Sequence, residues 1–430
     1  MNRLYYPEDK LPLARLVPMG LQHVVAMFGA TVLAPILMGF NPQTAIFFSG
    51  LGTLIFIVIT RAKVPSYLGS SFAFIGPVLA VTGGAAENIP FALFGVAAAA
   101  VLYALAAAAT MKYGSRWIDR LMPPVVTGAV VAIIGLNLSS SAVANFLNPD
   151  FRLASGADAV RLLVAGVTFL TAAGVSLYLK GFMRLLPILT GVVTGYILAL
   201  TLGVIGPEQL AAIANAPWLG LPPFITPKFS LEAVLVIAPV FVVLVAENKG
   251  HIEAIGGYMK RDLNPHLGRA YLGDAVASFV SAMGGGTPQT TYAENMGVMA
   301  ITRVFSVYNF IAAACIALLL GLCPKFGAVI QSIPAPVLGG VTVILYGLIA
   351  MMGIKIWLDA KVDFCAHKNL IIAGSSIIVA TGLGIKGFTA GSVNIAGIAF
   401  GTVLAVVMNL VLSFGGEDPA AAGQDHAECA

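Results

Sequence analysis

The amino-acid sequence predicts an all-α polytopic membrane protein, and three observations lead to this class. Hydrophobic residues make up 59% of the 430 residues, and charged residues only 10%. The mean hydropathy is +0.93, whereas soluble domains carry about 25% charged residues. The apolar residues fall in blocks of roughly 20, the length of a membrane-spanning helix, and not in the alternating ten-residue segments of an outer-membrane barrel. A water-soluble fold is therefore excluded.

Fourteen apolar blocks are candidate transmembrane segments. They fall at 15–38, 42–60, 64–84, 89–111, 122–143, 158–179, 185–205, 231–256, 268–285, 286–302, 304–323, 334–354, 367–385 and 391–414. The third and tenth are rich in Gly, Ser, Thr and Pro. In a helix each Gly costs about 1 kcal/mol and each Pro about 3 kcal/mol relative to Ala. We therefore expect both of these spans to be broken.

Basic residues give the expected orientation of the chain. With the N-terminus in the cytoplasm, 17 of the 23 Lys and Arg residues fall on the cytoplasmic side and five on the outer side, with Lys249 inside a span. This asymmetry is the positive-inside pattern. Both termini are then cytoplasmic, and residues 415–430 are expected to form a disordered cytoplasmic tail.

The chain also contains an internal repeat. Residues 124–136 align without gaps to residues 336–348, with Pro, Val, Gly, Val, Gly and Leu at matching offsets. The two broken spans are separated by a similar shift. Because each half contains seven spans, an odd number, the halves must have opposite orientations. The sequence thus predicts a 7+7 inverted repeat, with a site near the midplane where the broken segments meet.

The stretch from Gly284 to Gly297 is the strongest candidate for that site. Three glycines and Pro288 interrupt it, and it carries the acid Glu294. A carboxyl group offers an acceptor, and a donor when protonated, which matches a planar –NH–C=O edge. The alternative is a carboxylate that caps free backbone N–H groups. In the other broken span, Ser71 offers a hydroxyl, and Phe72 a face for stacking or an ordinary packing contact.

Glu247 and His251 are candidates for proton coupling. They are four residues apart, which places both on one helix face, and an imidazole titrates near neutral pH. The alternative is a structural ion pair. Lys249 points away from that face, although a contact with Glu247 stays open.

Four further polar residues lie in apolar blocks. His23 and Asp274 could serve the site or bond to neighbouring helices, because intramembrane polar groups need a partner. Tyr292 and Tyr346 could donate hydroxyls to a ligand or simply pack. No paired cysteines, His-x-x-x-His or Gly-x-Ser-x-Gly are present, so we expect no metal, no cofactor and no enzymatic activity.

At this point several motifs resemble one family. Residues 294–303 (ENMGVMAITR) are similar to the signature of the nucleobase–ascorbate transporters, an acid or amide followed by Asn-x-Gly, four residues and Thr. Residues 22–32, 65–74 and 290–303 look like the bacterial uracil permeases of that family. The similarity extends over essentially all fourteen spans.

The resemblance implies a core domain (15–111 and 231–325) and a gate domain (112–230 and 326–414). It further implies two short antiparallel strands in the broken spans and a homodimer formed through the gate domain. By motif position, Glu247 and Glu294 would bind a pyrimidine, with main-chain contacts from Phe72 and Ala293. His251 and His23 would belong to the proton-linked network.

The expected function is proton-coupled import of uracil across the bacterial inner membrane by alternating access. The expected partners are a nucleobase, membrane lipid and a second copy, with no nucleic acid. The chain has Asn248 where uracil permeases often have His, and Lys249 where they have an apolar residue. Import of xanthine or a broader set of bases stays open. An anion transporter of the same fold is less compatible with two acids at the site.

Overall fold

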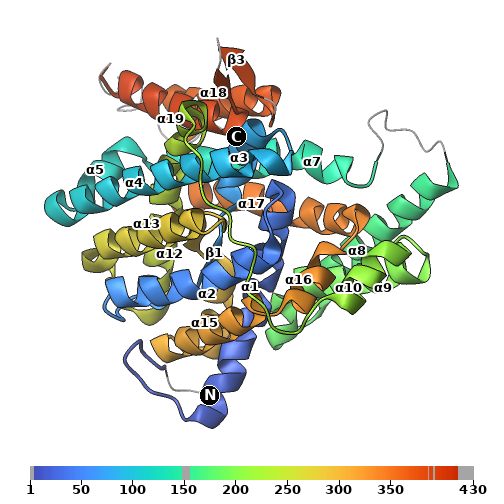
Figure 1. Ribbon diagram of the computed structural model, residues 1–430. Helices are drawn as coiled ribbons and strands as arrows, with labels where there is room; N and C mark the ends of the chain where they lie inside the picture. The colour runs from blue at the N-terminus through green and yellow to red at the C-terminus, as the bar shows by residue number, and fades with distance from the viewer. Residues whose placement is uncertain (1–3, 148–154, 386, 391–392, 415–430) are drawn as a thin grey trace.

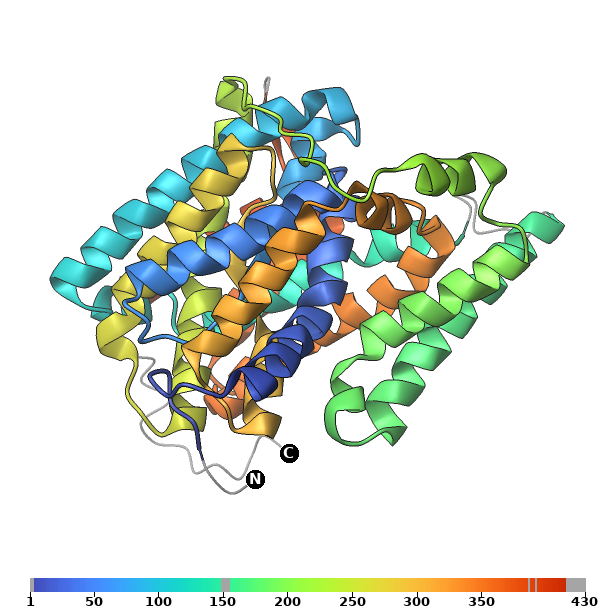
Figure 2. The same cartoon turned by 60° about the horizontal axis from the view of Figure 1, so that its bottom comes forward.

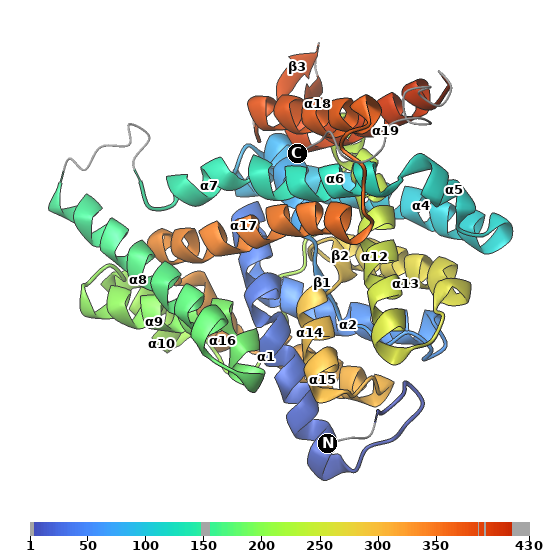
Figure 3. The same cartoon turned by 180° about the vertical axis from the view of Figure 1, so that it is seen from behind.

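The computed structural model describes residues 4–147, 155–385, 387–390 and 393–414, and the expected tail at 415–430 lies outside them. Figures 1 and 3 show a mostly helical molecule with two short strands, β1 and β2, near its centre. The helices form two packed groups around this pair.

The first group surrounds the central strands. Within it α4 packs on α13, α13 on α2, and α2 on α15, which also contacts α1. Its elements are α1 (Leu13–Met38), α2 (Pro42–Ile59), β1 (Leu68–Ser70), η1 (Phe72–Phe74), α3 (Ile75–Thr82), η2 (Ala86–Asn88), α4 (Ile89–Tyr113), α11 (Leu231–Ile237), η4 (Ala238–Val240), α12 (Phe241–Met259), η5 (Asn264–His266), α13 (Leu267–Met283), β2 (Gln289–Thr291), α14 (Ala293–Thr302) and α15 (Val307–Gly321).

The second group packs around α17. That helix contacts α6, α7, α8 and α9, while α18 and α19 pack on each other and on α6. Figure 2 shows α8 and α9, in green, side by side at the edge of the molecule. The elements are α5 (Arg116–Leu121), α6 (Pro124–Asn137), α7 (Ser139–Ala144), α8 (Gly156–Tyr178), η3 (Gly181–Leu185), α9 (Pro187–Thr201), α10 (Pro207–Asn215), α16 (Pro324–Gln331), α17 (Ala335–Asp359), α18 (His367–Leu383), β3 (Phe388–Ala390), β4 (Val393–Ile395) and α19 (Gly397–Phe414).

The helices identify a multi-pass membrane protein. Among the described residues, seven helices are long and apolar enough to cross a membrane, or eight if the bent pair α15 and α16 counts as one span. Other predicted spans are interrupted or form helices of 15 to 17 residues, as α9, α13 and α18 do, so this count falls below the number of apolar blocks. Many large apolar side chains are exposed on α8 and α9, among them Leu170 and Ile197, as expected for surfaces that face lipid.

The two repeated segments pack against each other as α6 and α17. Both helices have Pro in the first turn, where the missing N–H costs nothing. Glycines allow the backbones of α6 and α17 to approach each other closely. A Cβ on Gly135 would lie 2.3 Å from the carbonyl oxygen of Tyr346, and one on Gly353 would lie 2.4 Å from that of Gly128.

The predicted helical blocks at 231–256 and 391–414 are divided in the structure. The block at 231–256 consists of α11, the short η4 and α12, because Pro239 in η4 cannot donate to a helical ladder. The block at 391–414 contains β4, which pairs with β3 as an antiparallel hairpin before α19 begins. The helix predicted for residues 393–395 was therefore wrong.

An extended segment, residues 216–230, connects α10 to α11 and crosses the first helix group (Figure 1). Backbone hydrogen bonds hold it there. Gly220 donates to Leu322 at 3.0 Å, Ile225 to Gly284 at 3.4 Å, and Lys228 to Pro90 at 2.8 Å. This segment therefore lies against the glycine turn that precedes β2.

Candidate functional site

The site is built on the pairing of β1 with β2. Leu68, Gly69 and Ser70 pair antiparallel with Thr291, Thr290 and Gln289, and all six residues are buried. The pairing extends one residue further at each end. Ser71 donates to Pro288 at 2.9 Å, and Tyr292 donates to Tyr67 at 3.0 Å. Segments more than 200 residues apart in the chain are thereby held side by side (Figure 3).

Side chains of neighbouring helices satisfy the outer edges of both strands. Leu68 donates its N–H to Thr53 Oγ1 on α2, at 2.9 Å. On the other strand, Gln289 donates its N–H to Ser278 Oγ at 2.9 Å, and Ser278 donates back to the Gln289 carbonyl at 3.0 Å. Non-helical backbone is tolerated at membrane depth only where such partners exist. The hydroxyls of α2 and α13 are therefore what allows a two-stranded sheet to persist inside the helix group.

The two candidate acids come together beside these strands. Glu247 lies on α12 and Glu294 in the first turn of α14, immediately after β2. Their carboxylates are close enough to interact electrostatically. Glu294 is also favoured by its position at a helix N-terminus. Two acids 47 residues apart in the chain thus converge where the helical backbone is interrupted.

Several buried polar atoms at this point have no hydrogen-bond partner among the described residues. They are Oε2 of Glu247, Oγ1 of Thr290 and Oγ of Ser71. The Thr290 hydroxyl lies near the Glu247 carboxyl group without a well-aligned hydrogen bond to it. Leaving a buried polar group unpaired costs about 1–3 kcal/mol, so polar atoms left without such bonds on α12, on β2 and directly after β1 suit a polar ligand. Carboxylate acceptors and hydroxyls that can donate or accept would together match a ring with alternating N–H and C=O groups.

A chain of side-chain hydrogen bonds links α12 to β2 and α13. Nδ1 of His251 lies 2.8 Å from Oγ1 of Thr291. Thr291 donates to Oδ1 of Asn248, and Asn248 donates to Asp274 and, at 2.7 Å, to Tyr103. Because the single hydroxyl proton of Thr291 goes to Asn248, the His251 nitrogen must be the donor to Thr291. The imidazole therefore carries its proton on Nδ1 and leaves Nε2 as the basic nitrogen.

Tyr292 has a structural position. Its hydroxyl donates to the Ser70 carbonyl at 3.1 Å and accepts from Thr31 Oγ1 at 3.2 Å. Its ring covers Gly69, where an added Cβ would lie 2.5 Å from the ring carbon Cζ. The side chain is 3% exposed. Its polar group is therefore already engaged in holding β1 on α1.

His23 is fully buried and joins α1 to α14. Asn295 lies 3.1 Å from its Nδ1 and donates to its carbonyl oxygen at 3.1 Å. The ring packs against Phe310 with a centroid separation of 4.5 Å. His23 thus contacts the helix that carries Glu294 through Asn295, one residue further along.

The remaining candidates lie in different environments. Phe72 is half-buried in η1, and Ala293 is exposed as the first residue of α14, where helix geometry leaves its N–H without an intrahelical partner. Tyr346 lies on α17 in the second helix group, and its buried hydroxyl lies near Ser141 of α7 without a well-aligned hydrogen bond. Lys249 lies 3.6 Å from Glu253.

Sequence reasoning missed four members of the site: Asn248, Thr290, Thr291 and Tyr103. Thr290 and Thr291 lie in the stretch from Gly284 to Gly297, shortly before Glu294, so their place in the chain was a signal. Nothing in the sequence around Tyr103, on α4, indicates a role at the site, because a single Tyr in an apolar helix is common. No group of three His, Cys, Asp or Glu able to hold a metal occurs in the described part of the chain.

Comparison with known proteins decides the family. Residues 14–391 match the model of the Permease family, Xan_ur_permease. The chain belongs to this family, the nucleobase–ascorbate transporters. The resemblance predicted from the motifs is confirmed, and the permease is a transporter and not an enzyme.

Named relatives cover nearly the whole permease. An Escherichia coli (strain K12) protein provisionally named the pyrimidine permease RutG is 45% identical, covering 95% of this chain and 91% of its own. The uracil permease of Bacillus caldolyticus is 39% identical over 94% of each chain. The uracil permease of Escherichia coli (strain K12) is 38% identical, covering 94% of this chain and 92% of its own.

Solved structures share the fold at low identity. The murine anion transporter Slc26a9, in an inward-facing state, matches with a TM-score of 0.68 and 10% identity, over 95% of this chain and 70% of that one. The transmembrane domain of a cyanobacterial bicarbonate transporter, BicA, matches with a TM-score of 0.61 and 14% identity, over 95% and 100%. At this identity the likeness concerns the fold alone.

Proposed function

We propose that the permease imports uracil together with a proton across the bacterial inner membrane. The observation that carries the proposal is the convergence of Glu247 and Glu294 beside β1 and β2, with buried polar atoms of Ser71 and Thr290 left unpaired. The names of the relatives, uracil and pyrimidine permeases, favour the same substrate class.

Both carboxyl groups form hydrogen bonds to the base. Uracil presents ring N–H donors next to carbonyl acceptors in one plane. Glu294 and Glu247 accept from the N–H groups, or donate to a carbonyl when protonated. The main chain at Ala293 and Phe72 supplies further contacts, and the Phe72 ring stacks on the base. Tyr346 closes the site from the second helix group. Tyr292, whose hydroxyl is engaged, supports β1 and does not contact the base.

The coupling proton resides on Glu247 or on Nε2 of His251. Thr291 holds the other imidazole nitrogen, so protonation at Nε2 leaves the link to β2 intact. The amide of Asn248 neither gains nor loses a proton near neutral pH. Asp274 therefore anchors the chain of hydrogen bonds and does not receive the proton from His251. Coupling requires only that proton and base each favour the other's binding.

Alternating access arises from movement of the core domain (15–111 and 231–325) against the gate domain (112–230 and 326–414). The two packing groups of helices support this division, and the α6–α17 pairing is compatible with fourteen spans in an inverted repeat. We further propose that both termini are cytoplasmic, and that a homodimer forms through the gate domain.

Two alternatives are weighed against uracil. A broader pyrimidine or xanthine permease would use the same acids, and the relative named as a pyrimidine permease favours that breadth. Anion transport is suggested by the fold neighbours alone. Two carboxylates at the site would repel an anion, so we place it last.

Uracil binding to the purified protein tests the site. Glu294→Gln and Glu247→Gln should each weaken binding at least tenfold, because a neutral amide cannot replace the charge-assisted acceptor. Glu253→Gln is the matched control, since that acid lies on α12 but pairs with Lys249. Isothermal titration measures all four proteins. Wild-type affinity in both site variants would refute the proposed site.

A further inference from the structure

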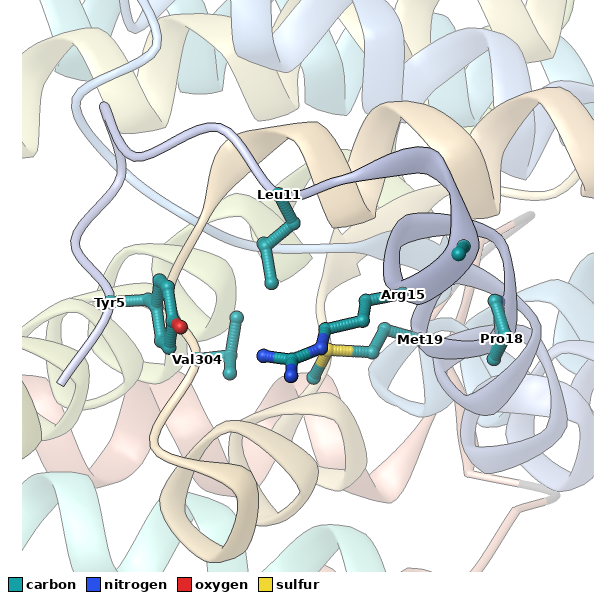
Figure 4. A pocket seen from close by; sticks show the side chains of 7 residues that line it. Tyr5, Leu11, Arg15, Pro18, Met19 and Val304 are labelled. Carbon is teal, nitrogen blue, oxygen red and sulfur yellow. The ribbon is translucent and has the colours of Figure 1, made fainter. Parts of the chain in front are cut away.

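A cavity of about 190 Å³ lies at the start of α1, away from the paired strands (Figure 4). One wall is α1, with Arg15, Pro18 and Met19, and the opposite wall includes Tyr5 and Val304. Its volume is about six times the ~30 Å³ that one molecule occupies in liquid water. It is therefore large enough for a small headgroup.

The wall opposite α1 is held by hydrogen bonds from the N-terminal segment. Tyr5 donates its N–H to the Arg303 carbonyl at 3.0 Å, and Phe305 donates to the Tyr5 carbonyl at 2.8 Å. Ser306 Oγ donates to the Asp9 carbonyl at 2.6 Å. The segment before α1 is thereby fixed on the α14–α15 connection, and the cavity between them has a defined shape.

Arg15 supplies the charge of this cavity. It is the one charged residue among those that line it, and its guanidinium points into the cavity (Figure 4). Within the described ranges no carboxylate lies at ion-pair distance from Arg15, and Glu8 is instead paired with Arg261 at 2.9 Å. A guanidinium without a carboxylate partner is well suited to a phosphate, which it can bind through two N–H donors.

Exposed apolar side chains surround the cavity. Leu13, Val17 and Leu21 are 76%, 54% and 50% exposed, and their spacing places them on one face of α1 next to the cavity. A second cavity, of about 330 Å³, shares Pro18 and Met19 with the first and reaches Phe182. Apart from Gln22, the residues that line this second cavity are apolar, and Pro18 and Met19 adjoin both cavities.

We propose that this is a binding site for an anionic phospholipid of the leaflet at the N-terminal end of α1, which the expected topology makes the cytoplasmic leaflet. The phosphate binds Arg15. The alkyl part lies along Pro18 and Met19 toward Phe182. A free phosphate ion would gain Arg15 and at most the Tyr5 hydroxyl, whereas a lipid uses the charge and also the apolar side chains of Pro18 and Met19. The proposal is independent of which base is carried.

Native mass spectrometry of the purified full-length permease tests the site. The protein is titrated with phosphatidylglycerol, with phosphatidylcholine, and with phosphatidylglycerol in the presence of excess glycerol 3-phosphate. Wild type should retain one phosphatidylglycerol about tenfold more firmly than phosphatidylcholine, because both lipids carry a phosphate but the choline cation of phosphatidylcholine would lie close to the Arg15 guanidinium. Glycerol 3-phosphate should not displace the lipid.

Two substitutions disrupt the proposed lipid site in different ways. Arg15→Gln removes the charge, and Ala14→Trp fills the cavity from an exposed position in the first turn of α1. Each should lose the preference for phosphatidylglycerol, while Arg116→Gln on α5 should keep it. The thermal midpoint of each variant in detergent is measured first, so that a variant that fails to fold is set aside and the other decides.

Three results would overturn the proposal. Equal retention of the two lipids by wild type would remove the role of the negative charge. Unchanged retention in a folded Arg15→Gln or Ala14→Trp protein would place the lipid elsewhere. Displacement by glycerol 3-phosphate would assign the site to a soluble phosphate compound.

Discussion

The hydroxyl of Thr291 lies 2.8 Å from Nδ1 of His251, and so joins strand β2 to helix α12 beside the two carboxylates. Thr291 also donates to Asn248. One small side chain therefore fixes both the imidazole that is proposed to take up a proton and the amide that holds Asp274.

Replacing Thr291 with Val removes that hydroxyl without changing the volume of the side chain much. His251 and Asn248 then each lose a partner, at a cost of about 1–3 kcal/mol per buried group. We expect kcat/KM for uracil uptake to fall at least tenfold and its dependence on pH to change, because the imidazole loses the partner that fixes its tautomer. Thr291→Ser keeps the hydroxyl and should stay within about threefold of wild type. A Thr291→Val protein with the wild-type rate and pH profile would contradict the proposed link.

Asn248 should matter for stability as much as for transport. It donates to the fully buried Asp274, and Asn248→Leu would leave that carboxylate with fewer donors. The free energy of unfolding should fall by about 3 kcal/mol, the cost of breaking a buried polar pair. Asn248→His can still donate an N–H and should lose less. Thermal unfolding in detergent compares the two variants, and equal midpoints for Asn248→Leu and wild type would show that the bond is not needed.

Tyr292 provides a test of a structural role against a binding role. Its hydroxyl bonds to Ser70 and Thr31, so Tyr292→Phe should lower stability by about 1 kcal/mol. The KM for uracil should change by less than about threefold, because the ring still covers Gly69. If KM instead rises more than tenfold while the thermal midpoint is unchanged, the hydroxyl contacts the substrate.

Gly285 should be intolerant of a side chain. Its φ is +86°, and an added Cβ would lie 2.6 Å from the backbone nitrogen of Ile225. Left-handed backbone costs a non-glycine residue about 1–2 kcal/mol, and the contact would displace the 216–230 segment as well. Gly285→Ala should therefore destabilise the protein by at least about 1–2 kcal/mol. Gly174→Ala on α8 is the matched control, since nothing lies within 4 Å of its added Cβ and Ala favours a helix. A neutral Gly285→Ala would show that the segment is not held at this point.

The sequence predicts the membrane class and the place of the site because both depend on local chemistry. Apolar blocks identify the membrane segments, and the glycines before Gln289 mark where a helix cannot continue. The strands β1 and β2 lie in the two blocks expected to be broken. Glu247 and Glu294 are recognisable because acids in apolar blocks need a reason to be there.

Other features depend on contacts between distant residues and leave no local pattern. Asn295 bonds to His23 across 272 positions of the chain, and nothing near either residue indicates the partner. The engagement of the Tyr292 hydroxyl depends in the same way on Ser70 and Thr31. Short breaks are also missed, as at Pro239, because a hydropathy window averages over one turn of irregular backbone.

Uptake of labelled uracil into proteoliposomes tests the central claim most directly. An inward proton gradient is imposed and then collapsed with a protonophore, using wild type and Glu247→Gln in parallel. We expect wild type to accumulate uracil above the external concentration. This accumulation should be lost when the gradient collapses and should be absent in Glu247→Gln. Accumulation that persists without a proton gradient, or a folded wild-type protein that takes up no uracil, would contradict it.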